Sequence, residues 1–283
     1  MPDILHFEFM RHALLAGLLA SVICGVMGSL VVVNRMVLLS GGIAHAAYGG
    51  IGLAFFLRWP YMLGTLLFST AAALVMAMVS LKAKHRADAI IGVIWAVGMA
   101  IGIILLDLTP GYNVDLMSYL FGSILTVPRG DLWIMFALGL VMVSMVWFFY
   151  TDLLALSYDE EFARIRGVPV KALYLMLVVL LAVAVVLIIQ VVGLILVIAL
   201  LTIPPFIAEK FSRTLAQMMG WSVLLSMLFT MGGLFMAYRL NLSAGACIIL
   251  VAGFSFFLSL AATYRAGGGA KGQPVHPHSA EAK

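Results

Sequence analysis

The residue with the clearest chemical potential is His45, which lies inside the apolar stretch LSGGIAHAAYGGIGLAFFL of residues 39–57. An ionisable side chain within a membrane is costly, usually faces the protein interior or a water-filled cavity, and marks a functional candidate. Neutral imidazole also binds first-row transition metals well. We therefore identify His45 as a candidate ligand for a divalent metal ion. The competing interpretation is a histidine that hydrogen-bonds a neighbouring helix and fixes its packing.

Glycines surround this histidine along its predicted helix. Gly41 and Gly49 lie one turn before and after it, and Gly42 and Gly50 repeat the same spacing around Ala46. Small residues four positions apart allow a second helix to approach closely. We expect these four glycines to serve helix packing or gating.

A second segment with chemical character is LSYDEEFARIRGVPVKAL, residues 156–173. The carboxylates of Asp159 and Glu161 suit the positive end of a helix that begins near them. Gly167 is placed to end that helix. The segment is predicted to form a short amphipathic helix of about two turns on the cytoplasmic face of a membrane. It serves either as a docking element or only to seal a loop.

The stretch IIQVVGLILVIALLTIPPFIAEKFSR, residues 188–213, holds two helices that follow each other almost directly. Gln190 and Gly193 are the only interruption between them. Pro204 and Pro205 are expected to bend or break the second helix. Broken helices often line transport routes, although they also occur in structural roles. We expect the two prolines to act in packing or gating.

The sequence lacks the phosphate-binding pattern G-x-x-x-x-G-K-[ST]. The chain therefore cannot hydrolyse ATP by that route, and it is predicted to be no enzyme. Any energy drawn from ATP would come from a separate subunit.

The elements that must position these residues are membrane helices. Hydrophobic residues make up 64% of the 283 positions and charged residues 10%, against roughly 45–50% and about 25% in soluble domains. Because crossing a bilayer takes roughly 20 apolar residues, an all-α polytopic protein with nine transmembrane helices is predicted, with eight or ten as alternatives. The expected helices span residues 10–33, 41–57, 61–81, 89–106, 131–150, 171–189, 191–208, 215–236 and 243–263.

The remaining segments are short. Residues 107–130 contain turn signals around about a dozen helical residues, too few to cross the bilayer, so a short outer helix is expected there. Residues 1–263 form the predicted transmembrane domain. Residues 264–283, rich in glycine and proline, are predicted to be a disordered cytoplasmic tail.

The distribution of basic residues predicts the orientation. Twelve of the sixteen Lys and Arg residues fall on one side of the predicted membrane. By the positive-inside rule that side is cytoplasmic, so the amino terminus lies outside and the carboxyl terminus inside. The net charge of +4 thus reflects topology and contact with membrane lipid, and nucleic-acid binding is not expected. The opposite side holds Arg11, Arg58, Arg129 and Arg239.

Four segments in order resemble the permeases of ABC importers for zinc, manganese or ferrous iron. The resemblance covers about residues 10 to 263. It implies a homodimer of this chain, cytoplasmic ATPase subunits, and an extracellular or periplasmic metal-binding protein that delivers the ion. It also implies the cytoplasmic (inner) membrane of a bacterium or archaeon, and no permanently bound cofactor, only the transported metal. The segments are MVLLSGGIAHAAYGGIGLA (36–54), DLMSYLFGSIL (115–125), YDEEFARIRGV (158–168) and VGLILVIALLTIPPFIA (192–208).

The resemblance also assigns roles to individual residues. In that family a glutamate, a small residue and a glycine mark the cytoplasmic loop that inserts into the ATPase, and Glu161, Ala163 and Gly167 match them. With Asp159 these residues are expected to couple the permease to its ATPase.

The sequence departs from the family beside His45. Many members carry an acidic residue one turn earlier, where this chain has Gly41. Manganese prefers carboxylate oxygen, whereas zinc accepts imidazole, so zinc or iron(II) is expected to be slightly favoured and manganese stays an alternative. Oxygen ligands from elsewhere could be Asn34, Ser40, Tyr48, Asp107, Asp115 or Gln190.

Three alternatives stay open. A secondary transporter or channel for metal ions would need no ATPase, but its expected mark, paired acidic residues deep in helices, is scarce. An ABC permease for metal chelates such as cobalamin would share the coupling loop but would need a wider path and a longer chain. An intramembrane enzyme would need further catalytic groups near His45, where only Ser40 and Tyr48 occur.

Overall fold

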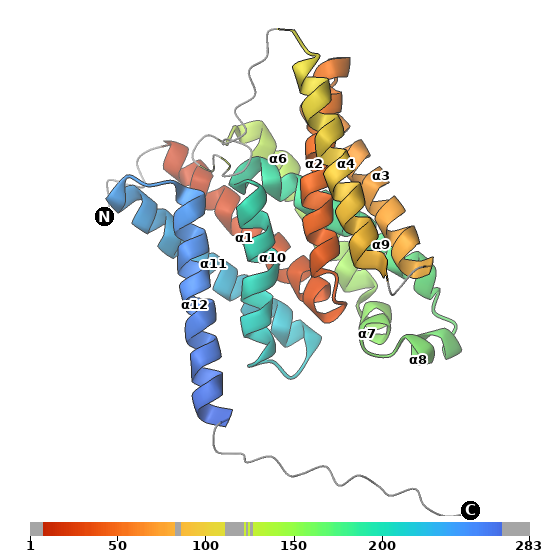
Figure 1. Cartoon of the computed structure of the whole chain (residues 1–283). Coiled ribbons are helices and arrows are strands. Elements are labelled where there is room, and N and C mark those ends of the chain that lie inside the picture. The colour runs from red at the N-terminus through yellow and green to blue at the C-terminus, as the bar shows by residue number, and fades with distance from the viewer. Residues whose placement is uncertain (1–7, 83–85, 111–121, 123, 125–126, 268–283) are drawn as a thin grey trace, which may run out of the picture.

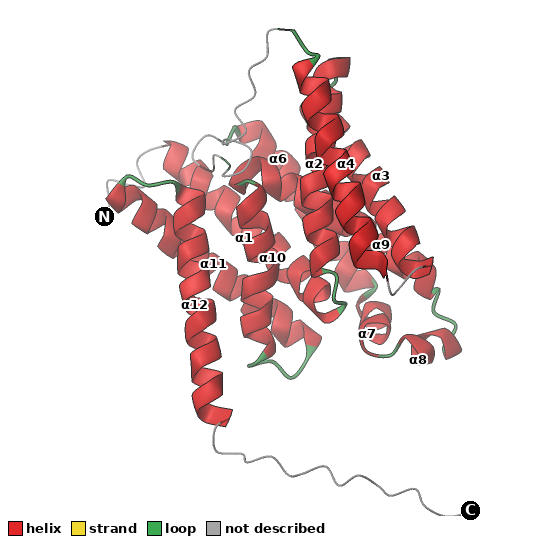
Figure 2. Ribbon diagram, viewed as in Figure 1, coloured by secondary structure: helices red, strands yellow, loops and turns green. Residues whose placement is uncertain are grey.

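The computed structural model describes the chain except residues 1–7, 83–85, 111–121, 123, 125–126 and 268–283. Every regular element in the described residues is a helix (Figure 2). The helices are α1 (Glu8–Val33), α2 (Val37–Leu57), α3 (Tyr61–Lys82), α4 (Ala87–Asp107), α6 (Arg129–Phe148), α7 (Tyr150–Tyr158), α8 (Glu160–Ile165), α9 (Val170–Val192), α10 (Leu194–Glu209), α11 (Leu215–Leu240) and α12 (Ala244–Gly267).

Each of the nine expected membrane segments coincides with a helix. Within the described residues, eight helices are long and apolar enough to cross a membrane. The ninth segment is α10, which has 16 residues and therefore a length of about 24 Å. The short outer helix expected within 107–130 and most of the expected tail lie outside the described residues.

The spanning helices form two groups joined by α9 and α10. Helix α2 packs against α3 and α4 on one side of the molecule, and α1 packs against α10 and α11, with α12 beside them (Figure 1). Helix α9 contacts α3 and α2, while α10 contacts α2 and α1. In their most apolar stretches, α2 is 78% buried and α9 is 72% buried, against 22% for α4 and α6. Helix α2, with His45, is therefore central.

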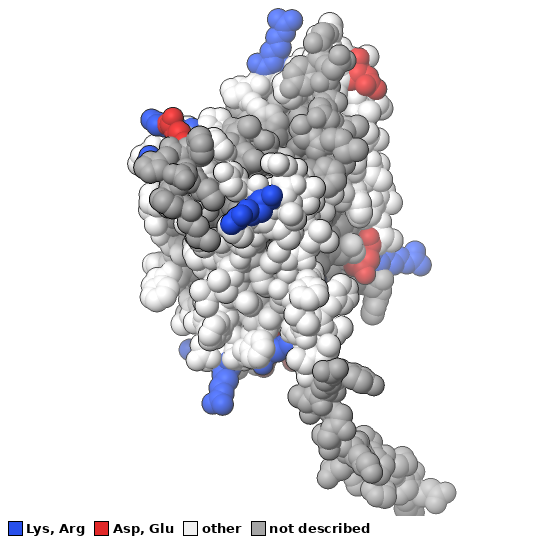
Figure 3. All heavy atoms as spheres, turned by 90° about the vertical axis from the view of Figure 1, so that its left-hand side faces the viewer, with Lys and Arg blue, Asp and Glu red and all other residues white. Residues whose placement is uncertain are grey.

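The two ends of the bundle differ in charge. We call the end that holds α7 and α8 the α8 end; it also carries the turns after α1 and α10 and the end of α12 (Figure 1). Arg35, Arg164, Arg166, Lys210 and Arg213 belong to the turns and helices of this end, whereas Arg11, Arg58, Arg129 and Arg239 lie near the other ends of α1, α2, α6 and α11. Most of the surface seen in Figure 3 is uncharged, although a Lys or Arg side chain lies near the middle of that face. This is the pattern of a protein that spans a bilayer.

Two expectations about helices are wrong in detail. The expected helix at 131–150 ends at Phe148, and a further helix that the sequence did not predict, α7, occupies Tyr150–Tyr158 before α8 begins. Helix α10 continues through Pro204 and Pro205 to Glu209, so the prolines do not break it.

Candidate translocation site and coupling element

His45 lies near the middle of α2 and stacks against α4. Its ring lies 4.1 Å from the ring of Trp95, with 15° between the two planes. The indole nitrogen of Trp95 donates a hydrogen bond to the sulfur of Met99, 3.1 Å away, on the same helix. Stacking of this kind holds the imidazole in one orientation. The sequence did not reveal Trp95, because only the crossing of α2 and α4 brings the two rings together.

The imidazole has an unused nitrogen. Nδ1 of His45 is buried and has no hydrogen-bond partner in the described structure. The side chain as a whole is half-buried. A neighbouring helix therefore does not hydrogen-bond Nδ1. Buried polar groups without partners in native proteins call for an explanation such as a ligand or ion.

Glycines bring α2 and α4 into backbone contact beside His45. A Cβ atom added to Gly49 would lie 2.7 Å from the carbonyl oxygen of Gly98, and one added to Gly52 would lie 2.4 Å from that of Gly102. Real Cβ atoms do not approach so closely, so these positions require glycine. Gly98 and Gly102 of α4 were missed by the sequence reasoning, although their spacing of four residues was the signal.

The other glycines of α2 fall into two kinds. A Cβ on Gly50 would lie 2.6 Å from Cα of Thr65 in α3, and one on Gly42 would lie 2.7 Å from Cγ2 of Ile91. Gly41 differs, because its nearest neighbour, Cδ1 of Ile198, would be 3.9 Å from an added Cβ. The structure thus leaves room for a Cβ atom one turn before His45.

No group of three or more His, Cys, Asp and Glu side chains that could hold a metal lies within the described part of the chain. Two of the residues suggested by sequence as oxygen ligands donate hydrogen bonds to other groups. The amide of Asn34 donates to Ser157 near the α8 end, and the hydroxyl of Ser40 donates to the carbonyl of Val37. Gln190 leaves its Nε2 buried without a partner, and Asp115 lies outside the described residues.

The junction between α9 and α10 lies at the opposite end from α8. Gly193, between the two helices, has φ 83° and ψ 166°, a backbone region reserved for glycine. Gly122 approaches it so closely that an added Cβ would lie 2.3 Å from the backbone nitrogen of Gly193. The outer connection between α4 and α6 therefore touches the junction directly at Gly122.

Helix α10 contains two prolines where α1 packs closely against it. Proline has no N–H, so Pro204 and Pro205 leave the carbonyls one turn earlier, including that of Leu201, without their helical donors. A Cβ on Gly28 of α1 would lie 2.6 Å from the Leu201 carbonyl oxygen and 2.9 Å from Cγ of Pro205. The prolines thus define a site of close packing between α1 and α10.

The predicted amphipathic element is α8, and local chemistry defines both of its ends. The carboxylate of Asp159 accepts a hydrogen bond from the backbone N–H of Phe162 at 2.9 Å, as a helix N-cap does. At the other end Gly167 has φ 79°. Its N–H and that of Val168 bond to the carbonyls of Arg164 and Ala163, which is the Schellman motif.

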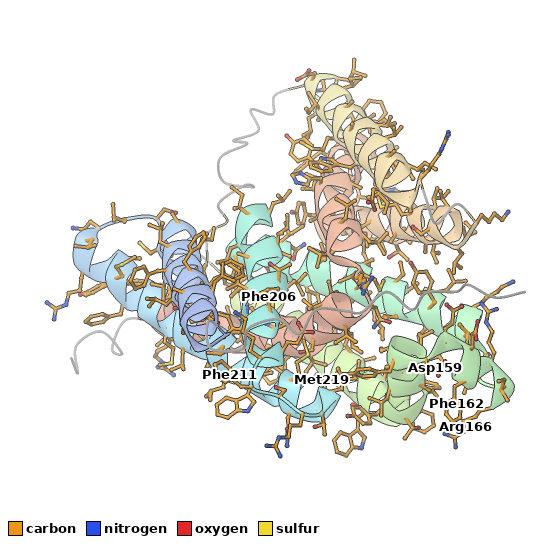
Figure 4. All side chains as sticks on the ribbon, turned by 60° about the horizontal axis from the view of Figure 1, so that its bottom comes forward. Asp159, Phe162, Arg166, Phe206, Phe211 and Met219 are labelled. Atoms are coloured by element: carbon orange, nitrogen blue, oxygen red, sulfur yellow. The ribbon has the colours of Figure 1, made fainter. Side chains whose placement is uncertain are left out.

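Helix α8 faces outward with apolar side chains. Ile165 is 85% exposed and Phe162 is 49% exposed, whereas Ala163 is fully buried. Arg166 lies over the ring of Phe162, and Arg164 pairs with Glu160. Figure 4 shows Asp159, Phe162 and Arg166 together at one edge of the α8 end. Exposed apolar groups outside the spanning region, rimmed by charges, are typical of protein interaction sites.

The fold and this site define a class: an all-helical, multi-pass membrane protein with a polar side chain in its most buried helix and a projecting helix at its basic end. The sequence matches the ABC 3 transport family over residues 6–263. The chain belongs to that family, and it is therefore a transport component of the membrane.

Individual relatives can be aligned with nearly the whole length of this chain. An uncharacterized membrane protein of Synechocystis is 50% identical over 261 residues, 92% of this chain and 93% of that protein. The manganese transport system membrane protein MntC of Halalkalibacterium halodurans is 30% identical and covers 91% of this chain and 88% of its own. The solved structure of PsaBC from Streptococcus pneumoniae in complex with Fab has a TM-score of 0.83 at 30% identity, covering 92% and 93% of the two chains.

Proposed function

We propose that this chain is the permease subunit of an ABC importer that carries a divalent transition-metal ion across the cytoplasmic membrane. The α8 end faces the cytoplasm, in keeping with its basic residues. Two copies of the chain enclose the route, and a separate extracellular or periplasmic protein delivers the ion. The observation that carries the proposal is the half-buried imidazole of His45, stacked on Trp95 with Nδ1 unpartnered, in the central helix α2.

In this proposal His45 makes a transient contact with the ion. A permease must bind its cargo weakly enough to release it, so a full set of ligands is not required. The neutral imidazole offers one nitrogen, and the stacked indole keeps the ring from turning away. Gly42, Gly49 and Gly50 hold α3 and α4 against α2, so the neighbouring helices move with the histidine.

The nucleotide-hydrolysing partner binds α8. Asp159 and Gly167 fix the two ends of this helix, and Ala163 packs inward, so the exposed Phe162 and Ile165 project toward the partner. ATP binding closes the partner subunits, and their movement displaces α8. The permease alternates between outward-open and inward-open states through that displacement.

Replacing His45 with alanine tests the role of the imidazole. Because even the supporting contacts of metal ligands contribute about 10-fold or more to affinity, His45→Ala is expected to lower metal uptake by roughly that factor. Gly41→Ala serves as the matched control, since its Cβ enters open space on the same helix. Uptake should be measured with a radioactive ion in cells that contain equal amounts of each permease. Full uptake by His45→Ala would leave the histidine with a packing role only.

Two observations bear on which metal ion is carried: the names of the relatives and the residue at position 41. Manganese is the cargo named for the relative from H. halodurans, whereas the missing carboxylate at Gly41 favours zinc or iron(II). We infer manganese as the main cargo, because the relatives match across the whole chain and the missing ligand affects one position.

Gly41→Asp should strengthen manganese selectivity. The substitution places a carboxylate one turn before His45, at a position where an added Cβ makes only an ordinary contact with Ile198, and hard ions prefer oxygen ligands. The ratio of manganese to zinc uptake should therefore rise by roughly fivefold, or about 1 kcal/mol. Gly41→Asn controls for size without charge. An unchanged ratio in the Gly41→Asp variant would show that position 41 does not face the ion.

A further inference from the structure

Helix α7 is attached at both ends to spanning helices by side-chain hydrogen bonds. At its start, the hydroxyl oxygen of Tyr150 accepts a bond of 3.1 Å from the backbone N–H of Ala216, near the start of α11. At its other end, the hydroxyl oxygen of Ser157 accepts a bond of 2.9 Å from the amide Nδ2 of Asn34, just after α1. Because α8 begins three residues beyond Ser157, a displacement of α8 acts first on the Asn34–Ser157 contact.

Both partners of this contact are oriented by further bonds. Nδ2 of Asn34 also donates to the carbonyl of Leu30 at 2.8 Å, and the hydroxyl of Ser157 donates to the carbonyl of Leu153 at 2.7 Å. Leu153 is buried, and both Asn34 and Ser157 are half-buried. The contact is thus a fixed, partly dry link between the last turns of α1 and α7, where water competes less for the bond.

The turn that follows Asn34 connects this link rigidly to α2. Arg35 adopts the left-handed conformation, with φ 56°. Its N–H bonds to the carbonyl of Val32 at 3.1 Å, and the N–H of Met36 bonds to that of Val31 at 2.8 Å, which again forms a Schellman motif. Helix α2 begins at the next residue and runs without interruption past His45. A shift of Asn34 therefore moves the start of α2.

A cavity beside the contact gives α7 room to move. It has a volume of about 470 Å³ and is lined by Arg35 and Ser157 together with Phe206 and Thr214 of the α10–α11 region. Tightly packed helices pass a small displacement on to their neighbours. A helix that borders empty volume can move with less repacking. The end of α7 next to Ser157 therefore borders empty volume, while Tyr150 holds the other end.

We propose that the hydrogen bond from Asn34 to Ser157 transmits the movement of α8 to α2 and hence to His45. In this proposal Asn34 and Ser157 are positioning residues, because they act through their contact with each other. The path is α8, Ser157, Asn34, the tight turn at Arg35, and α2. This proposal rests on the proposed function, because it assumes that a partner displaces α8. Coupling of this kind follows contiguous hydrogen-bonded contacts between rigid elements.

The test measures how many metal ions are imported per ATP hydrolysed by the complete transporter in lipid vesicles. Ser157→Ala and Asn34→Ala should each lower this ratio by roughly fivefold or more, the low end of typical coupling between sites, while ATP hydrolysis continues. The double variant should fall no further, since both changes remove one interaction. Ser157→Thr keeps the hydroxyl and should retain the ratio.

Ser212→Ala is the matched control. The hydroxyl of Ser212 lies on the same cavity and donates to the carbonyl of Ala208 within its own segment, so its loss should leave the ratio unchanged. A ratio within about twofold of the unmodified transporter in Ser157→Ala would overturn the proposal and reduce the contact to a packing role. Absence of ATP-driven import in the unmodified complex would instead overturn the proposed function, and this proposal with it.

Discussion

Alanine at Gly50 is expected to remove most of the folded permease from the membrane. The added Cβ would lie 2.6 Å from Cα of Thr65 and 3.0 Å from the carbonyl oxygen of Gly64, and both of these are backbone atoms of α3. A flexible side chain could turn aside, but the backbone of a packed helix cannot. Overpacking of this kind costs about 1–3 kcal/mol, a large fraction of the stability of a typical protein.

The same substitution at Gly41 provides the control for Gly50→Ala. Gly41 lies on the same helix, and its Cβ would meet no atom closer than 3.9 Å, so Gly41→Ala should leave stability unchanged. The measurement is the thermal midpoint of the detergent-solubilised permease, together with the amount recovered from membranes. If both variants had the stability of the unmodified chain, the result would contradict the close packing of α2 against α3 at Gly50.

Valine at Gly167 is expected to abolish ATP-driven uptake while leaving the spanning helices intact. Gly167 has φ 79°, where a residue with a Cβ is strained by about 1–2 kcal/mol, and β-branched residues are the least tolerated. The Schellman motif would open, and Phe162 and Ile165 would lose their orientation. No atom lies within 4 Å of the added Cβ, so the effect comes from backbone strain and not from a clash.

Gly167→Asn tests whether uptake depends on the left-handed backbone conformation at position 167 or on glycine itself. Asparagine tolerates the left-handed conformation, so this variant should retain most of the uptake that Gly167→Val loses. The measurements are ATP-driven uptake and binding of the ATPase subunit to the permease in detergent. Normal uptake by Gly167→Val would show that the shape of the α8 end has no role in coupling.

The membrane helices and the ends of α8 could be predicted from the sequence because their causes are local. Each spanning helix is a long apolar run, and the carboxylate of Asp159 and the positive φ of Gly167 need only their own neighbours in the chain. The start of α2 at Val37, four residues before the expected one, shows that the glycine-rich stretch did not mark its boundary.

The features that depend on tertiary packing were not predictable. Helix α7 follows α6 after a break at Phe149, which carries neither glycine nor proline to signal it. Helix α10 continues through Pro204 and Pro205, where a break was one of the two expectations, and Gly28 of α1 packs against that turn. The stacking of Trp95 on His45 requires α4 to cross α2, which no spacing within either helix indicates.

The most direct test of the proposed function is metal uptake into sealed lipid vesicles that contain the purified permease, with and without its ATPase subunit, delivery protein and ATP. We predict that manganese enters only when all of these components are present, and that uptake stops when a non-hydrolysable ATP analogue replaces ATP. Rapid entry of the ion through the permease alone would contradict this account, because the chain would then be a channel or a secondary transporter.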